Sequence, residues 1–469
     1  MTSFLDRIYN FSPAIVQNLM VTGYGLKMYR REYGRKFREK LDEFEKTQWY
    51  SESELRDYQA ERLRALLEHC YENIPYYRRV MDDLKLTPRD FKGLDDLQKI
   101  PILTREDVKK NFRQLIARNY KPSDLILGRT SGTTGSPLEF YWDRQACVVK
   151  NVVDWRQKGW GGIHFGDKMA FALGRVVVPT KQRKPPFWRI NLAMRHLYLS
   201  SLHMSKDNLK AYLDKLAKFA PVALEGYPST MHLLAHYLRG QKLKFLVKAV
   251  FTSSEALFPK QREMIEDAFE CKVFDFYGMA ERVIFATECS EHTGHHINMD
   301  YGITEFIKDD SQESSNGGFA RIVATGLHNY AMPLIRYQTS DLSEPRKGKC
   351  PCGRNFPLMD DVTTRVEDLI LTRDGRYISS QILSHPFKPI KNIIESQVIQ
   401  EDIDRLHIKI VREKQYNDDD TKALLEGLAI RVGPEMKFDI EFVDSVPRTA
   451  AGKVKFVISK VTAGDQIKL

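Results

Sequence analysis

The stretch 130–136, with the sequence Thr-Ser-Gly-Thr-Thr-Gly-Ser, combines two glycines with five hydroxyl side chains. Glycine lets backbone N–H groups approach an anion closely, and hydroxyl groups add donors that can rotate toward it. A loop of these residues can wrap around phosphate oxygens, and its candidate ligands are Ser131, Gly132, Thr133, Thr134 and Gly135. A surface turn of similar composition is the alternative.

The residues after this loop exclude one common kind of phosphate-binding loop. An apolar run, Leu-Glu-Phe-Tyr-Trp, occupies 138–142, so the loop opens into a strand and not into a helix. The Gly-x-x-x-x-Gly-Lys-Ser/Thr sequence of an ordinary P-loop NTPase is absent here.

Four further motifs follow the loop along the chain. They are Phe-Tyr-Gly-Met-Ala-Glu at 276–281, Arg-Tyr-Gln-Thr-Ser-Asp-Leu at 336–342, Thr-Arg-Val-Glu-Asp-Leu-Ile at 364–370 and Pro-Arg-Thr-Ala-Ala-Gly-Lys-Val at 447–454. In order and spacing, the five motifs resemble the core motifs of the adenylate-forming enzymes, the superfamily of acyl-CoA synthetases and nonribosomal adenylation domains. The resemblance covers essentially the whole chain.

Within this superfamily the chain most resembles the phenylacetate-CoA ligase branch. Three features carry that resemblance: the serine-containing loop, Asn-Ile-Pro-Tyr-Tyr-Arg at 73–78, and Cys-Pro-Cys-Gly-Arg at 350–354. The stretch 25–38, followed by Gln-Ala-Glu-Arg-Leu at 59–63, looks like the CapK group, which is associated with capsule and other polysaccharide biosynthesis.

The resemblance implies roles for individual residues in binding ATP. The hydroxyl loop would hold the β- and γ-phosphates, Tyr277, beside Gly278, would stack on adenine, and Asp341 would accept both ribose hydroxyls. Glu281 would bind Mg²⁺, which prefers hard carboxylate oxygens. An ordinary buried aromatic residue and a surface acid are the alternatives at Tyr277 and Glu281.

Two cations complete the implied catalytic set. Arg365 would assist at the ribose or phosphate. Lys453 would bridge the carboxylate and the α-phosphate, where its positive charge stabilises the reacting groups most strongly if water is excluded. A solvated lysine is the alternative for Lys453. The familiar Gly-Arg-x-Asp-Asp pattern is replaced by Thr-Arg-Val-Glu-Asp at 364–368, and the missing glycine would stiffen the hinge between domains.

Cysteines and histidines form a second group of candidate ligands. Thiolate and imidazole are the usual ligands of tetrahedral zinc. Members of the resembled branch pair a Cys-Pro-Cys-Gly motif with an upstream Cys and His, and some carry zinc there, which implies the set Cys289, His296, Cys350 and Cys352. Since His295 and His296 alternate along a predicted strand, only one of them can be a ligand. His295 or His292 can substitute for His296, and free reduced cysteines are the alternative.

The implied reaction is ATP-dependent activation of a carboxylic acid to acyl-AMP, followed by transfer of the acyl group to a thiol. CoA is the default acceptor, and an amine or a sugar is the alternative acceptor. An aryl acetate or a sugar- or amino-acid-linked acid fits the resembled groups. We expect the substrate pocket to include Tyr227, Ser253, Ser254, Glu255 and Phe276. The rival function is a catalytically silent scaffold of a polysaccharide assembly, and the retained Asp341 and Lys453 argue against it.

The sequence predicts an α/β protein with the adenylate-forming fold. We expect a helical N-terminal region at 1–115, where prolines separate amphipathic stretches, and an ATP-binding adenylation core of several sheets at 116–365, where strands and helices alternate. A small, mobile α+β lid domain follows at 366–469.

Composition narrows the partners and the compartment. Lys and Arg (72) exceed Asp and Glu (62), which gives a net charge of +10. This excess suits ATP, CoA or a membrane surface and is too diffuse to indicate nucleic acid. Six cysteines without a secretory signal favour a reducing cytoplasm.

Two segments predict peripheral contact with the inner face of a membrane. The stretch 11–28 is apolar, but Gln17, Asn18 and Lys27 interrupt it, so it falls short of the roughly 20 apolar residues of a spanning helix. A basic cluster at 27–40 follows it, and a second segment at 175–195, predicted to be a surface loop, is basic and free of acids. Such segments attract anionic lipid, and solvated helix faces are the alternative.

Overall fold

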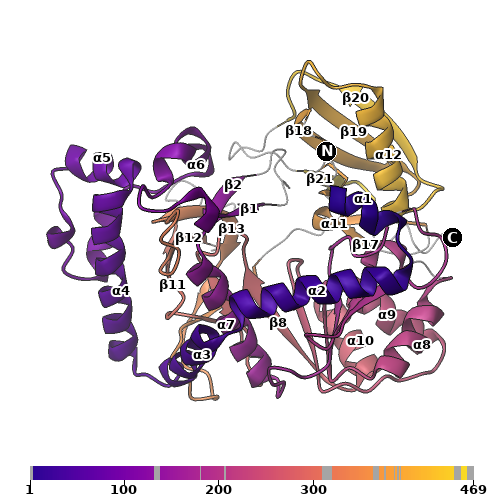
Figure 1. Cartoon of the computed structure of the whole chain (residues 1–469), viewed down its shortest axis with the longest axis horizontal. Coiled ribbons are helices and arrows are strands. Elements are labelled where there is room, and N and C mark those ends of the chain that lie inside the picture. Colours follow the sequence, from indigo (N-terminus) through magenta and orange to yellow (C-terminus); the bar gives the residue numbers. More distant parts are fainter. Residues whose placement is uncertain are drawn as a thin grey trace.

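The computed structural model describes residues 4–130, 138–179, 181–204, 207–308, 320–362, 369–373, 377–384, 386–387, 390, 392–447 and 456–461. The N-terminal helices α4–α6, the large central sheet with its covering helices, and the C-terminal strands β18–β20 with α12 occupy separate regions of the molecule (Figure 1). Within the described ranges, no helix is both long and apolar enough to cross a membrane.

The N-terminal region is helical, as the proline-separated pattern predicts. Its helices are α1 (Phe4–Phe11), α2 (Ala14–Glu32), α3 (Arg35–Thr47), α4 (Glu52–Asn73), α5 (Pro75–Asp83), α6 (Arg105–Lys110) and the 3₁₀ turns η1 (Pro88–Asp90), η2 (Leu94–Lys99), η3 (Phe112–Leu115) and η4 (Pro122–Asp124). Helix α4 begins in a capping box, because Ser51 accepts from the N–H of Glu54 and the Glu54 carboxylate accepts from the N–H of Ser51.

A ten-stranded mixed sheet forms the centre of the molecule, in the order β14-β15-β10-β9-β8-β7-β6-β3-β5-β4. Its strands are β3 (Met169–Ala172), β4 (Trp188–Asn191), β5 (His196–Leu199), β6 (Ala223–Gly226), β7 (Ala249–Ser253), β8 (Lys272–Gly278), β9 (Phe285–Thr287), β10 (His295–Ile297), β14 (Pro345–Arg346) and β15 (Leu358–Met359). The five neighbours β5, β3, β6, β7 and β8 are parallel. Every residue of β7 is buried, as expected for a parallel strand covered on both faces.

Helices cover both faces of this sheet. The covering helices are α7 (Arg144–Trp160), α8 (Leu209–Phe219), α9 (Pro228–Gly240) and α10 (Pro259–Phe269), with the 3₁₀ turn η5 (Ser201–His203). Leu216, Leu234 and Ile265 of α8–α10 share one hydrophobic core with the sheet, whereas Phe37 of α3 and Val152 of α7 belong to another. This layering of helices over a mainly parallel sheet is the predicted α/β class.

Smaller sheets complete the core domain. The ribbon β1 (Ile126–Arg129) and β2 (Glu139–Trp142) is antiparallel, and the sheet β11 (Gly302–Ile307), β12 (Ala320–Gly326) and β13 (Tyr337–Ser343) has three antiparallel strands. An isolated parallel bridge joins Leu103, just before α6, to Tyr337 at the start of β13. This bridge brings the N-terminal region beside the motif at 336–342.

The C-terminal unit has a separate core. Its elements are β16 (Leu369–Leu371), β17 (Tyr377–Ser379), α11 (Ser380–Ser384), β18 (Ile393–Asp402), β19 (Arg405–Arg412), α12 (Asp418–Val432), β20 (Lys437–Phe442) and β21 (Val457–Ser459). Strands β20-β19-β18-β21 form one sheet, and Val398, Ile408 and Leu424 are fully buried between the sheet and α12. The small α+β unit is therefore as predicted.

The segment 175–195 agrees only in part with the surface loop that its composition predicts. It contains strand β4, and the side chains of Phe187 and Arg189 are fully buried. Arg189 donates a hydrogen bond to Gln17 of α2. The prediction is therefore right for the exposed cations Arg175, Lys181, Arg183, Lys184 and Arg195 and wrong for β4, because α2 covers Arg189.

Candidate active site and metal centre

Three parallel strands end beside one another at the predicted substrate pocket. Tyr227 follows β6, Ser253 ends β7, and Phe276 lies near the end of β8, where it pairs with Ser253 in register. All three side chains are buried. The carboxyl ends of parallel strands are the usual ligand edge of an open α/β sheet.

The turn after β7 arranges the remaining pocket candidates. Ser254 has a φ of 68°, a left-handed conformation that turns the chain sharply out of the strand. Glu255 then accepts a hydrogen bond from the N–H of Ser229, at 3.1 Å, near the start of α9. The Glu255 carboxylate therefore links the loop after β7 to the loop after β6.

Tyr277 and Asp341 meet although they lie 64 positions apart in the chain. The Tyr277 hydroxyl donates to Asp341 Oδ2 at 2.7 Å, and the N–H of Asp341 donates to Thr339 Oγ1 at 3.2 Å. Burial, followed by the negative charge of Asp341, raises the pKa of Tyr277 well above its ordinary value. The phenol thus stays protonated and fixes the orientation of the carboxylate. Gly278 continues β8 directly after Tyr277.

Glu281 lies in the same region, beyond the end of β8. It is buried and accepts a hydrogen bond from the Tyr337 hydroxyl at 3.0 Å. Burial raises the pKa of Glu281, and the nearby charge of Arg105 opposes that shift. A cation beside this carboxylate would favour its ionised form.

Arg105 is a site residue that the sequence interpretation missed. It lies in the first turn of α6, which Thr104 and Asp107 begin with a capping box, and it donates to Thr130 Oγ1 at 3.2 Å. Its positive charge also opposes the rise that burial causes in the pKa of Tyr337 and of Glu281. The capping box is the only local signal in the sequence, and it predicts a helix start but not its proximity to the hydroxyl loop.

The hydroxyl loop itself lies outside the described residues, but its two ends are fixed. The N–H of Thr130 donates to the carbonyl of Leu138, and the N–H of Leu138 donates to Thr130 Oγ1. The loop therefore connects the paired strands β1 and β2. The candidates Ser131, Gly132, Thr133, Thr134, Gly135, Arg365 and Lys453 all lie outside the part of the chain that the structure describes.

Cys289, His296, Cys350 and Cys352 converge on one point. Their candidate ligand atoms all lie within 4.8 Å of one another. The Cys289 and Cys350 sulfurs are 3.5 Å apart, and Cys352 Sγ is 3.4 Å from His296 Nε2. With metal–sulfur bonds of ~2.3 Å and metal–nitrogen bonds of ~2.0 Å, tetrahedral ligand atoms lie roughly 3.5–3.8 Å apart. The two measured separations are close to this range, so the four residues form a candidate site for a tetrahedral metal ion.

The residues around His296 orient its ring toward the cysteines and keep it neutral, as a metal ligand requires. Its Nδ1 lies 3.3 Å from the carbonyl oxygen of Phe356, so Nδ1 carries the proton and donates it there, and Nε2 keeps its lone pair toward the thiols. Burial lowers the pKa of His296 to about 4, which keeps the imidazole neutral at pH 7. A neutral imidazole is the form that binds metal.

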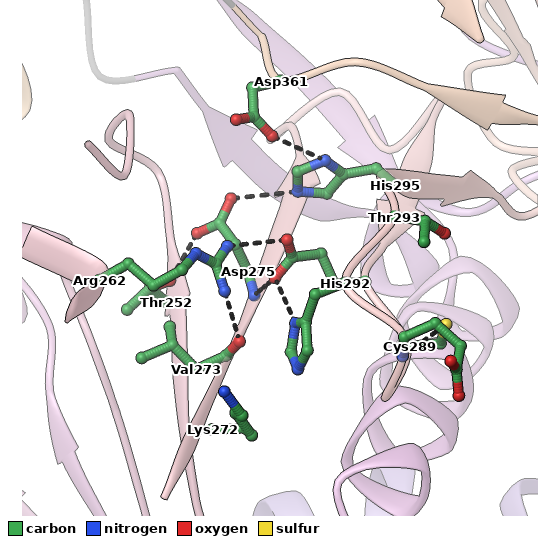
Figure 2. Close-up of polar contacts among 12 residues, drawn as sticks. Thr252, Arg262, Lys272, Val273, Asp275, Cys289, His292, Thr293, His295 and Asp361 are labelled. Atoms are coloured by element: carbon green, nitrogen blue, oxygen red, sulfur yellow. Dashed lines mark hydrogen bonds and ion pairs between the residues drawn. The ribbon is translucent and has the colours of Figure 1, made fainter. Parts of the chain in front are cut away.

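The other two histidines have different partners. Figure 2 shows His295 between Asp275 of β8 and Asp361, with Nε2 3.2 Å and Nδ1 3.3 Å from their carboxylates. His292 points instead toward Glu288, with Nδ1 3.5 Å from the carboxylate, and Arg262 also contacts Glu288. His295 and His296 thus face opposite ways along β10, as strand alternation requires.

Solved structures define the class of protein to which this fold belongs. The 2-hydroxyisobutyryl-CoA ligase in complex with 2-HIB-AMP and CoA, in the thioesterification state, has a TM-score of 0.56 at 20% identity and covers 90% of this chain and 93% of that chain. An open conformation of the same ligase, also with 2-HIB-AMP and CoA, has a TM-score of 0.51 at 20% identity. It covers 86% of this chain and 91% of that chain. The chain has the fold of the adenylate-forming acyl-CoA ligases.

Sequence comparisons identify the relatives within that class. Residues 370–460 match the CapK C-terminal domain. Protein CapK of Staphylococcus aureus is 29% identical over 97% of this chain and 100% of its own length. Phenylacetate-coenzyme A ligase of Thermus thermophilus is 26% identical over 70% of this chain and 74% of its own length. The chain is thus a relative of CapK and of the phenylacetate-coenzyme A ligases, which confirms the resemblance seen in its motifs.

Proposed function

We propose that this protein is an ATP-dependent ligase that activates a carboxylic acid as acyl-AMP and transfers the acyl group to a thiol, with CoA as the default acceptor. The observation that carries this proposal is the pairing of Tyr277 with Asp341 and of Glu281 with Tyr337, beside the two ends of the hydroxyl loop. Relatives named as phenylacetate-coenzyme A ligases support it.

Each residue of the pair Tyr277 and Asp341 has a part in binding the nucleotide. Asp341 accepts hydrogen bonds from the two ribose hydroxyls. The hydrogen bond from Tyr277 holds the Asp341 carboxylate in the orientation that binds them. The ring of Tyr277, which is only partly buried, supports adenine by stacking. Glu281 holds Mg²⁺, which supplies positive charge to the triphosphate when bound.

The chemistry then proceeds in two displacements. A carboxylate oxygen of the substrate attacks the α-phosphorus of ATP, and the bond from that phosphorus to pyrophosphate breaks. Ser131, Gly132, Thr133, Thr134 and Gly135 hold the β- and γ-phosphates, and Arg365 and Lys453 place positive charge at the reacting phosphate. In the second step the thiol sulfur attacks the acyl carbon, AMP leaves, and the thiol proton is released.

The substrate acid occupies the ends of β6, β7 and β8 in this proposal. Tyr227, Ser253, Ser254, Glu255 and Phe276 line it and combine aromatic surface with hydroxyl and carboxylate groups. We place the enzyme in polysaccharide biosynthesis because its sequence resembles the CapK group, and in the cytoplasm because its six cysteines suit a reducing compartment. A sugar- or amino-acid-linked acid has the polar groups that Glu255 and the two serines can bind.

We also propose one structural Zn²⁺ at Cys289, His296, Cys350 and Cys352. The convergence of four donor atoms and the orientation of His296 by Phe356 support it. A bound zinc ion would cross-link the chain and so contribute free energy of folding.

The test is a pyrophosphate-exchange screen with purified protein, ATP and a panel of aryl acetic, hydroxy, amino and uronic acids. We expect exchange with at least one class of acid, followed by thioester formation when CoA is added. Exchange without thioester would point to an amine or sugar acceptor. ATP binding without exchange for any acid would instead support the catalytically silent scaffold.

A further inference from the structure

The first two helices carry an unusual concentration of exposed apolar side chains. Of the fifteen large hydrophobic side chains that are exposed in the described chain, seven lie between residues 8 and 26. They are Ile8, Phe11, Ile15, Val16, Leu19, Tyr24 and Leu26. Phe11 is 91% exposed, Ile15 75% and Leu19 63%. Scattered exposed apolar residues are normal, but a contiguous set indicates a binding surface.

Two more exposed apolar residues extend this set from the neighbouring segment. Val176 precedes Val177, whose carbonyl accepts a hydrogen bond from the Tyr9 hydroxyl at 2.6 Å. The N–H of Leu192 donates to Thr22 Oγ1 of α2 at 3.1 Å. We call these nine residues of α1, α2 and the adjoining segment the apolar surface.

Helix α2 is docked on the protein through its polar side. Gln17 is 2% exposed and accepts a hydrogen bond from Arg189, and Asn18 accepts from the N–H of Ile190 at 2.9 Å. Strand β4 is the edge of the large sheet, and Asn18 and Thr22 satisfy the N–H and the carbonyl of Ile190, which an edge strand would otherwise leave open. Gly25 lies so close to Asn191 that a Cβ atom would clash with it.

The amphipathicity of α2 is therefore reversed in part, because polar residues are buried on its docked side although Tyr29 also stacks on Phe165 there. A helix on the surface of a soluble domain normally buries its apolar stripe and exposes its polar face. Here Gln17, Gly25 and Glu32 are buried, whereas Ile15 and Leu19, one turn apart, point outward. Because its polar face is already docked, α2 has no need to turn its apolar stripe inward, and that stripe is left for an external partner. Figure 1 shows α2 running across the face of the molecule as one long helix.

Positive charge borders the apolar surface on one side. No acidic residue occurs from Arg7 to Arg31, and Lys27, Arg30, Lys36 and Arg38 are exposed at the end of α2 and in α3. Arg35 is also exposed but pairs with Glu39 at 3.0 Å. A second copy of this chain would bring the same cations together, whereas an anionic surface would be attracted to them.

We propose that α1 and α2 dock this protein on an anionic lipid bilayer. The apolar surface enters the boundary between head groups and acyl chains, and Lys27, Arg30, Lys36 and Arg38 contact the phosphate groups beside it. Binding is reversible and depends on salt, since it rests on shallow apolar contacts and on charges that salt screens. The helices lie in the plane of the surface and keep their present contacts with β4.

The experiment is flotation of the full-length protein with vesicles of phosphatidylcholine alone or mixed with phosphatidylglycerol, at several salt concentrations. We expect flotation with the mixed vesicles at low salt, and weaker flotation as salt rises. The variant Phe11→Ser/Ile15→Ser/Leu19→Ser should bind about tenfold or more weakly, since it removes three apolar side chains from the bilayer boundary. The matched control is Leu243→Ser/Leu246→Ser, which removes two exposed leucines elsewhere and should bind normally.

The charge contribution is tested separately with Lys27→Ala/Arg30→Ala/Lys36→Ala. This variant should lose most of its preference for the mixed vesicles, whereas Lys218→Ala/Lys242→Ala, which removes exposed cations elsewhere, should keep it. Circular dichroism and thermal melting confirm that each variant is folded. The proposal is overturned by absence of flotation at low salt, or by equal binding of the apolar variant and its control. It is also overturned if the apolar surface forms a dimer in sedimentation experiments without lipid and the apolar variant dissociates it.

Discussion

The substitution Cys352→Ser tests the metal centre most directly. Cys352 Sγ lies 3.4 Å from His296 Nε2, and a serine hydroxyl at this position is neutral at pH 7 and a poor ligand for zinc. The three remaining ligands would leave the fourth tetrahedral position to water. We therefore expect close to one zinc per chain in the natural protein and a large loss of zinc in the variant.

The size of the stability change follows from the length of chain that the metal closes. Cys289 and Cys350 lie 61 positions apart, and a cross-link over such a loop stabilises a protein by roughly 4 kcal/mol in the chain-entropy treatment of disulfides. With an unfolding entropy of about 2.1 cal/mol/K per residue, this corresponds for 469 residues to a fall in melting temperature of roughly 4 °C. The neighbouring Arg354, whose guanidinium lies 4.2 Å from the Trp160 ring centre, should lose order with the loop.

The assay combines elemental analysis of reduced, tag-free protein with thermal melting of the same sample. Cys271→Ser is the matched control, because this partly buried cysteine lies outside the four-residue cluster and its loss should leave the zinc content unchanged. Natural protein without stoichiometric zinc, or a Cys352→Ser variant that retains its zinc, would refute the reasoning. Loss of zinc with an unchanged melting temperature would refute the structural role.

Three further predictions concern the active site and the buried histidines. Lys453→Ala should abolish pyrophosphate exchange while the protein stays folded and binds ATP; exchange at the natural rate would remove this lysine from catalysis. Tyr277→Phe loses its 2.7 Å hydrogen bond to Asp341 and should raise KM for ATP by about tenfold at most, so an unchanged KM would count against the pairing. Burial lowers the pKa of His196 to about 3, so the folded protein holds this ring neutral while the unfolded chain protonates it below pH ~6.5. The free energy of unfolding should therefore fall by up to about 1.4 kcal/mol per pH unit as pH drops from ~6.5 toward 3. Urea unfolding between pH 7 and 5 should show this slope, with a smaller one in His196→Gln.

Some parts of this structure could be predicted because the signal is local. The alternation of His295 and His296 predicts a strand with opposite side-chain directions, and the structure places them so in β10. The run of three acids before Thr421 predicts a helix start, and α12 begins there with Asn417 as its N-cap. These features depend on neighbours only a few positions away.

Other parts could not be predicted because distant segments decide them. Gln17 and Asn18 look like interruptions of an apolar helix, yet they are the residues that dock α2 on the edge strand β4. Arg105 approaches Glu281 only because Leu103 bridges to Tyr337, more than two hundred positions away. No local pattern in the sequence specifies either pairing.

The proposed metal centre and the proposed nucleotide site are connected through the residues between them. Strand β8 carries Tyr277 at one end and, two positions earlier, Asp275, which contacts His295 (Figure 2). His295 adjoins His296, so the imidazole that faces the thiols and the one that faces β8 share one short strand. A shift of β10 on loss of metal would therefore reach Tyr277, the proposed adenine platform, through the His295–Asp275 contact and through the pairing of β10 with β9 and of β9 with β8. In this proposal the four-residue cluster influences the active site through strand positions, because β10 pairs with β9, and β9 pairs with β8, which carries Tyr277.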